Sequence, residues 1–177
     1  GMETATENLL GEMGTLVPTL GLLDADYHAA IVVGDSGCPV GPDPYVDNSY
    51  TIRDAKAAFT TMADVDFDLA PLGSNAARGF MQVEAALSSK NLAPDGCNAA
   101  LYREDAFLSV VHVSDESEQS VNTWSYYVAL FQSLKADPED VVINAIAGDY
   151  PSGCGAAAPG VGYYEASVAT GGRFLSI

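Results

Sequence analysis

The chain has 177 residues, the size of one ordinary domain, and its 24 acidic side chains against 7 basic ones give a net charge of −17. Such a surface repels nucleic acid and anionic membranes, so we expect neither as a partner. No apolar run approaches the roughly 18 residues that a membrane-spanning helix needs, so membrane insertion is not expected. The acidic balance is compatible with divalent cations or basic partners, although solubility in a salty medium is the simpler explanation for most of it.

Predicted helices and strands alternate along the chain. Apolar residues at helical spacing predict a first helix from about 6 to 20, kinked or shortened by Pro18, and further helices over 53–62, 74–89, 121–135 and 161–170. Apolar runs predict strands over 29–33, 107–113, 141–147 and 173–177, with a short edge strand near 49–52. The alternation predicts an α/β fold with one mostly parallel, doubly wound sheet and helices on both faces, a three-layer arrangement.

The three cysteines, Cys38, Cys97 and Cys154, each lie beside Gly, Pro or Asn in loop-like sequence. None forms a Cys-x-x-Cys pair, which disfavours zinc binding and dithiol redox chemistry. Loop cysteines more often form disulfides, which implies an oxidising, extracytoplasmic location. Because three is odd, one thiol is free or pairs outside this chain. Three free thiols in a cytoplasmic protein remain the alternative.

Acidic and hydroxyl side chains follow three predicted strands. Asp35 follows the first, the run Asp115-Glu116-Ser117 the second, and Asp149 the third. Ligands collect beyond the carboxyl ends of parallel strands, so these residues are expected at one edge of the sheet. Carboxylates and hydroxyls without an intervening lysine suit Mg²⁺, Mn²⁺ or Ca²⁺. The alternative is that each is a turn residue or helix cap.

Residues 107–117, FLSVVHVSDES, resemble the fourth strand of von Willebrand factor type A domains. In that family an aspartate just after this strand belongs to a metal-ion-dependent adhesion site, and Asp115 holds the position. Gly73-Ser74-Asn75 before a helix resembles the family's second metal loop, with Ser74 at the threonine position. Segments around 126–127, 143–148 and 169–174 also resemble bacterial members. The resemblance therefore implies one such domain over 1–177.

The family's first metal loop, Asp-x-Ser-x-Ser at the end of its first strand, has no counterpart here. The resemblance thus implies an N-terminally incomplete domain whose sheet lacks its first strand. We expect rearranged strands or another copy of the chain to fill that slot, because unpaired backbone groups are costly. With only Ser74 and Asp115 left as ligands, Mg²⁺, Mn²⁺ or Ca²⁺ should bind weakly or not at all. The family also implies a partner for Cys154 just beyond Ile177.

The resemblance implies a non-enzymatic binding or adhesion module that contacts a protein or cell-surface component outside the cytoplasm. Glu116, Ser117 and Tyr126 are the predicted partner contacts. One alternative is a Mg²⁺-dependent hydrolase or phosphotransferase that uses Asp35, Asp115 and Asp149, although no lysine or arginine is predicted at a strand end to clamp a phosphate. The other is a structural fragment or assembly module that needs an absent N-terminal segment.

Other motifs carry less weight. Residues 34–37, GDSG, copy the string around a trypsin-like nucleophile, but only His28 precedes it and the predicted fold is not all-β. His112 lies in the middle of a predicted strand, which favours a core histidine over a catalytic base. The glycine-rich segment 153–162 lacks the Lys-Ser/Thr of a phosphate loop. Trp124 fits the apolar stripe of its helix and is predicted to pack in the core.

Overall fold

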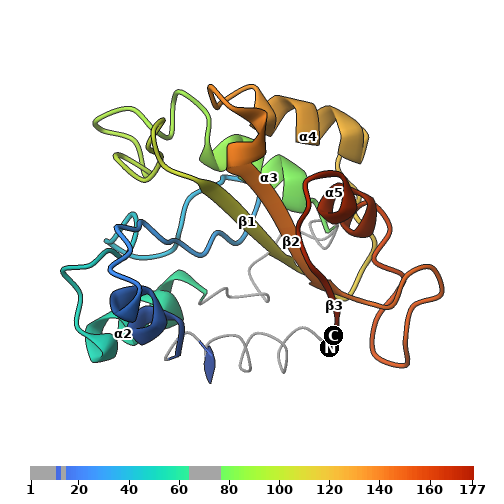
Figure 1. The fold of residues 1–177 in the computed structure, drawn as a ribbon, viewed down its shortest axis with the longest axis horizontal. Coiled ribbons are helices and arrows are strands. Elements are labelled where there is room, and N and C mark those ends of the chain that lie inside the picture. The colour runs from blue at the N-terminus through green and yellow to red at the C-terminus, as the bar shows by residue number, and fades with distance from the viewer. Residues whose placement is uncertain (1–10, 13–14, 64–76) are drawn as a thin grey trace. The chain divides into compact units, whose positions relative to one another are not determined.

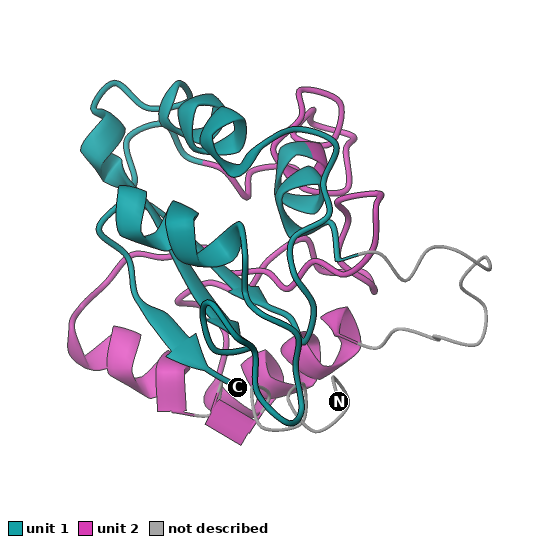
Figure 2. Ribbon diagram, turned by 90° about the vertical axis from the view of Figure 1, so that its right-hand side faces the viewer, with its two compact units in different colours: residues 1–2, 75–84, 103–177 teal, residues 3–74, 85–102 magenta. Residues whose placement is uncertain are grey.

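The computed structural model describes residues 11–12, 15–63 and 77–177 and shows a mixed α/β fold (Figure 1). The chain divides into two compact units (Figure 2): unit 1 comprises residues 1–2, 75–84 and 103–177, and unit 2 comprises residues 3–74 and 85–102. Residues 11–12 and 15–22 are helical. The other elements are α2 (Ile52–Met62), α3 (Gly79–Ala86), β1 (Leu108–Val113), α4 (Trp124–Gln132), the 3₁₀ helix η1 (Pro138–Asp140), β2 (Val141–Ala147), α5 (Tyr163–Ala169) and β3 (Phe174–Ser176). Within the described ranges, no helix is both long and apolar enough to cross a membrane.

The three strands of unit 1 form a parallel sheet in the order β1-β2-β3. Residues 108–113 of β1 pair in register with residues 141–146 of β2, and residues 145–147 of β2 pair with β3. Helix α4 connects β1 to β2, and α5 connects β2 to β3. These are the crossovers that parallel neighbours require. The predicted strands over 107–113, 141–147 and 173–177 are confirmed, and so is the α/β class.

One face of this sheet is buried by α3, α4 and α5 (Figure 1). Alternate residues of β2 are buried, as expected when one face of a strand meets the core. The core of unit 1 consists of Phe80, Val110, Tyr127, Val128, Phe131, Val141, Ile143, Ala145, Ala147, Tyr163 and Ala166. Within unit 1 the helices therefore lie on a single face of the sheet. The doubly wound, three-layer arrangement remains a prediction.

Strand β1 is at one end of the strand order, so no strand among the described residues pairs with its other edge. The side chains of Phe107 and Val111 are 59% and 54% exposed. The predicted slot of a missing first strand, and its filling by rearranged strands or another copy of the chain, stay predictions.

The predicted strand over 29–33 is wrong. Ala29 makes a single antiparallel bridge with Val46, through two backbone hydrogen bonds of 2.9 and 2.7 Å. Ala29, Ala30 and Ile31 pack instead in the core of unit 2, against a cluster that includes Val46 and, from α2, Phe59. Periodicity cannot separate a short buried strand from an apolar segment that packs without a ladder, which explains the error.

The predicted edge strand near 49–52 is also wrong, because this segment turns and starts α2. The Asp47 carboxylate accepts hydrogen bonds from the backbone N–H of Ser49 (2.9 Å) and from its hydroxyl (2.6 Å). Thr51 then has extended backbone dihedrals and is the N-cap of α2. An Asp turn followed by a threonine N-cap is local chemistry that ends a strand and begins a helix.

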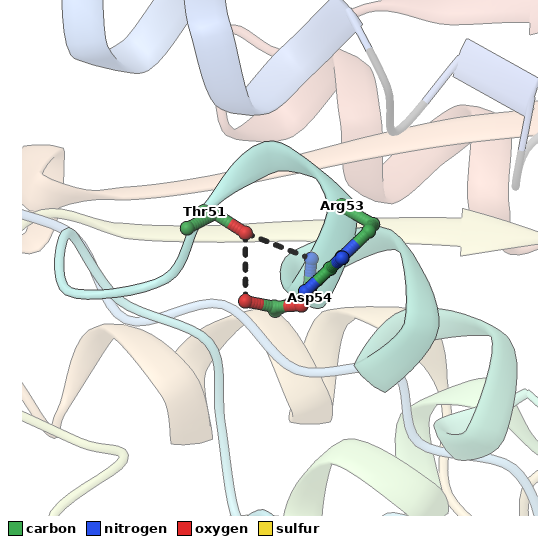
Figure 3. A network of polar contacts seen from close by, with 3 residues as sticks. All are labelled: Thr51, Arg53 and Asp54. Atoms are coloured by element: carbon green, nitrogen blue, oxygen red, sulfur yellow. Dashed lines mark hydrogen bonds and ion pairs between the residues drawn. The ribbon is translucent and has the colours of Figure 1, made fainter.

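Thr51→Ala is expected to lower the free energy of unfolding by about 1 kcal/mol. The Thr51 hydroxyl accepts from the backbone N–H of Asp54 (3.2 Å) and donates to the Asp54 carboxylate (2.7 Å), which also contacts Arg53 (Figure 3). Alanine leaves this N–H of the first turn without its side-chain acceptor. Urea denaturation measures the change. Thr60→Ala is the control, because its hydroxyl only bonds back to the carbonyl of Lys56, and equal effects of the two variants would contradict the capping role.

Helix α3 begins later than predicted. Residues 77–78 are not helical, so the helix does not run continuously from Ser74, which itself lies outside the described residues. The first turn of α3 is capped from a distant loop: Glu118 accepts from the N–H of Phe80 (3.4 Å) and the Ser120 hydroxyl accepts from the N–H of Met81 (3.1 Å). Because these capping residues lie almost forty positions along the chain, the sequence near α3 contains no signal for where the helix begins.

Cys38 and Cys97 form a disulfide within unit 2, with their Cα atoms 5.7 Å apart. The Asn98 side chain next to it donates to the carbonyl of Gly37 at 2.7 Å, which fixes the same two segments together. Cys154 is a half-buried free thiol. The prediction that loop cysteines form a disulfide and leave one over is confirmed. A partner for Cys154 beyond Ile177 stays a prediction.

Candidate functional site

The carboxyl ends of β1 and β2 lie side by side in unit 1. Val113 pairs with Ile146, and the N–H of Ser114 continues the ladder to the carbonyl of Ile146 at 3.1 Å. Asp115 and Asp149 therefore follow neighbouring strands at the same edge of the sheet. The parallel pairing inferred from the sequence brings these two aspartates to one edge, where ligands of open α/β sheets collect.

Two loops rise from this edge and are joined to each other. We call residues 114–123 the first edge loop and residues 148–162 the second edge loop. The N–H of Ala158 donates to the carbonyl of Asp115 (2.8 Å), and the N–H of Glu118 donates to the carbonyl of Val161 (3.0 Å). The Ser117 hydroxyl donates to the carbonyl of Pro159 at 2.5 Å. The two loops are therefore connected to each other. The Ser117 hydroxyl proton is used in this connection.

Of the four predicted metal ligands, the described part of unit 1 contains only Asp115 and Asp149. Asp115 is half-buried and Asp149 is exposed. Asp35 lies in a loop of unit 2 and follows no strand. The expectation that it follows a strand of the sheet is therefore wrong. Across residues 11–12, 15–63 and 77–177, no three His, Cys, Asp or Glu side chains are grouped to hold a metal ion. A ligand pair of Ser74 and Asp115 remains a prediction, because Ser74 is not described.

Two of the predicted partner contacts are accessible. Glu116 is exposed and accepts a hydrogen bond from the Gln119 side chain at 2.7 Å. Tyr126 is 45% exposed, while the adjacent Tyr127 is fully buried in the core of unit 1. Tyr126 therefore points outward from α4, as the helical pattern predicts. Helix α4 begins directly after the first edge loop.

A pocket of about 340 Å³ opens where the two edge loops meet the first turns of α4 and α5. We call it the edge pocket, and every residue that lines it belongs to unit 1. Its lining residues combine two carboxylates, several hydroxyl and amide groups and one indole: Glu118, Ser120, Asn122, Thr123, Trp124, Ser125, Val161, Gly162 and Glu165. A pocket with a few convergent polar groups at this edge is the arrangement expected of a binding site.

The two carboxylates of the edge pocket are held by the backbone. Glu118 accepts from the N–H of Ser120 at 2.9 Å and also from its hydroxyl. Glu165 accepts from the N–H of Gly162 at 2.7 Å, across the first turn of α5. Gly162 has a φ of +89°, and a Cβ there would lie 2.7 Å from the Cβ of Glu118, so glycine lets the two loops touch.

Sequence reasoning missed Glu118 and Glu165 and assigned Trp124 only to the core. Trp124 does pack against the core of unit 1, but it also lines the edge pocket. A glutamate at the third position of a helix, as Glu165 is in α5, is one half of the capping-box signal, and Gly162 at the N-cap has no side chain to supply the other half. Glu118 offers no such signal, because its contacts reach α3 through tertiary structure.

Beneath the first edge loop lies a buried aromatic group around His112. The His112 ring packs edge-on against Phe80 and also contacts the Tyr163 ring, with centroids 4.9 and 5.0 Å apart. Its Nε2 has no hydrogen-bond partner among the described residues, and burial lowers the pKa of His112 to about 3. Burial also raises the pKa of the Tyr163 phenol, and the nearby Glu118 carboxylate adds to this shift. The predicted core position of His112 agrees with this burial, and the ring is packed away from the pocket lining.

The chain matches no protein-family model, no curated protein and no solved structure. The resemblance of residues 107–117 to von Willebrand factor type A domains therefore stays a prediction. Function has to be inferred from the geometry of the edge loops and of the edge pocket.

Proposed function

We propose that this protein is a non-enzymatic binding module that works outside the cytoplasm and recognises a protein or cell-surface component through its edge loops. The observation that carries the proposal is the edge pocket, which lies beyond the carboxyl ends of parallel strands and is built from two loops and two helix starts. Its volume is at the lower end of the range that small-molecule or side-chain sites occupy. The exposed Glu116 and Tyr126 would extend the contact surface around it.

The disulfide supports the location. Cys38–Cys97 closes a loop between residues 59 positions apart, and such bonds persist in oxidising compartments. The net charge of −17 disfavours nucleic acid and anionic membrane as partners. An extracytoplasmic partner with neutral or basic groups fits both observations.

The hydrolase alternative has less support. Asp115 and Asp149 share the sheet edge, but among the described residues no lysine or arginine that could clamp a phosphoryl group lines the edge pocket. Hydrolysis of an aryl phosphate in the presence of Mg²⁺, lost in Asp115→Asn and Asp149→Asn, would replace binding by catalysis as the function.

A peptide and glycan array probed with the fluorescently labelled chain is expected to show saturable binding to one chemical class. Ser125→Tyr should abolish that binding, because an exposed serine that lines the edge pocket is replaced by a ring that fills it. Ser133→Tyr is the matched control, since this exposed serine is at the opposite end of α4, outside the pocket.

Metal dependence is measured in the same assay. Loss of binding in EDTA and in Asp115→Ala would make metal-mediated adhesion the mode of recognition, whereas binding that survives both is metal-independent. No saturable binding to any class, or binding that Ser125→Tyr leaves intact, would contradict the proposed function of the edge pocket.

A further inference from the structure

The charged groups that line the edge pocket are both acidic. Glu118 and Glu165 are these groups, and no lysine, arginine or histidine of the described residues lines the pocket. A pocket lined by two carboxylates and no compensating cation favours a positively charged occupant, because opposite charges attract. The net charge of −17 adds a long-range field of the same sign.

Both carboxylates are oriented before any ligand arrives. Backbone N–H groups of Ser120 and Gly162 hold them at 2.9 and 2.7 Å, respectively. The Gly162 bond belongs to the start of α5, whereas Glu118 caps α3 through a separate bond from the N–H of Phe80 (3.4 Å) and also accepts from the Ser120 hydroxyl. An ionised carboxylate offers about four lone-pair directions, of which the Phe80 and Ser120 groups use three on Glu118, while Glu165 accepts from Gly162. A cationic ligand in the pocket would donate to the directions that remain, chiefly on Glu165.

The remaining lining suits a planar or elongated organic cation better than a bare metal ion. Trp124 contributes an indole, a ring system that attracts guanidinium and ammonium groups. The hydroxyls of Ser120 and Thr123 and the amide of Asn122 supply neutral acceptors. The volume of about 340 Å³ far exceeds that of one ion, and the described residues hold no group of three metal-binding side chains.

We propose that the edge pocket binds a guanidinium or primary ammonium group, held between Glu118 and Glu165 and packed against Trp124. This inference rests on the proposed binding function and names its ligand chemistry. Such a group can come from a basic side chain of a partner protein or from a free small amine, and the two sources share the same charge-assisted hydrogen bonds to carboxylate.

Calorimetric titration of the full chain with N-acetyl-L-arginine amide tests the proposal. Saturable binding is expected, and N-acetyl-L-citrulline amide, which has nearly the same shape but no charge, should bind at least about tenfold more weakly. N-acetyl-L-lysine amide compares the ammonium with the guanidinium. Agmatine and putrescine serve as the free-amine arm, and tighter binding of these than of the capped amino acids would identify a small amine as the ligand source.

Glu165→Gln isolates the charge, because the glutamine amide oxygen can still accept from the N–H of Gly162. This variant is expected to weaken arginine-amide binding by about tenfold or more. Glu139→Gln on η1 makes the same change of net charge at an exposed position outside the pocket and should leave affinity unchanged. If Glu165→Gln does not fold, Ser125→Tyr blocks the same pocket from an exposed position and should remove binding.

Three results would overturn the inference. Equal affinity for the arginine and citrulline amides would show that charge is not recognised. Equal weakening by Glu165→Gln and Glu139→Gln would show attraction to the overall charge rather than to the pocket. Binding of array ligands without binding of any basic probe would refute the cation site, yet leave the proposed binding function standing.

Discussion

Removing the Cys38–Cys97 disulfide is expected to lower the free energy of unfolding by about 4 kcal/mol. The bond closes a loop between residues 59 positions apart, and the entropy that such a loop loses in the unfolded chain gives this magnitude. The double variant Cys38→Ala/Cys97→Ala, compared with the oxidised wild-type chain by urea denaturation followed by circular dichroism, measures the change.

Cys154→Ala is the control for the loss of sulfur itself, because Cys154 forms no disulfide within the chain. It should shift the urea midpoint little. The native contacts around the bond, including the Asn98 hydrogen bond to Gly37, are not removed by the double variant, so the expected loss is mainly that of the cross-link. A double variant as stable as the control would contradict the stabilising role of this disulfide and weaken the argument for an oxidising location.

Acidification between pH 7 and pH 4.5 is expected to destabilise the protein by about 2.5 kcal/mol through His112 alone. Burial lowers the pKa of this ring from 6.5 to about 3, so the folded state keeps it neutral while the unfolded chain takes up a proton. The unfolded state therefore binds more protons throughout this interval. Stability falls by about 1.4 kcal/mol for each pH unit once the pH is well below 6.5, until the folded pKa is approached.

Urea denaturation of the wild-type chain and of His112→Gln over this pH range measures the effect, and the variant should have the flatter profile. His28→Gln is the matched histidine control, because His28 stacks on Tyr45 in unit 2, outside the core of unit 1. The lowered pKa values of Asp47 and Asp54 act in a separate window, since the stability they contribute is lost only below about 3.8. A His112→Gln profile parallel to the wild-type one would contradict this account.

The sequence predicts unit 1 better than unit 2, and the reason lies in local signals. Strand β2 is an apolar run bounded by Pro138 and Gly148, and the structure ends it at the predicted residues. In unit 2, helix α2 is also confirmed to within one residue. The segment 29–33 has the same apolar character, but packing against α2 rather than a neighbouring strand determines its structure. Composition alone cannot distinguish these outcomes.

The site was predictable in position but not in composition. Parallel pairing was enough to bring Asp115 and Asp149 to one edge of the sheet. The edge pocket depends instead on contacts between the two edge loops, such as Glu118 with Val161, that connect residues far apart in sequence. The disulfide pairing has the same character, because three loop cysteines allow three pairs and only the fold brings Cys38 to Cys97.

The position of Trp124 gives the protein an intrinsic optical probe. It is the only tryptophan of the chain, and it lines the edge pocket while packing partly against the core. Indole emission responds to the polarity of its surroundings, so an occupant that displaces water from this wall should change the fluorescence of the unlabelled protein. Occupancy of the pocket can therefore be followed at micromolar concentration without a dye, a tag or a second chromophore.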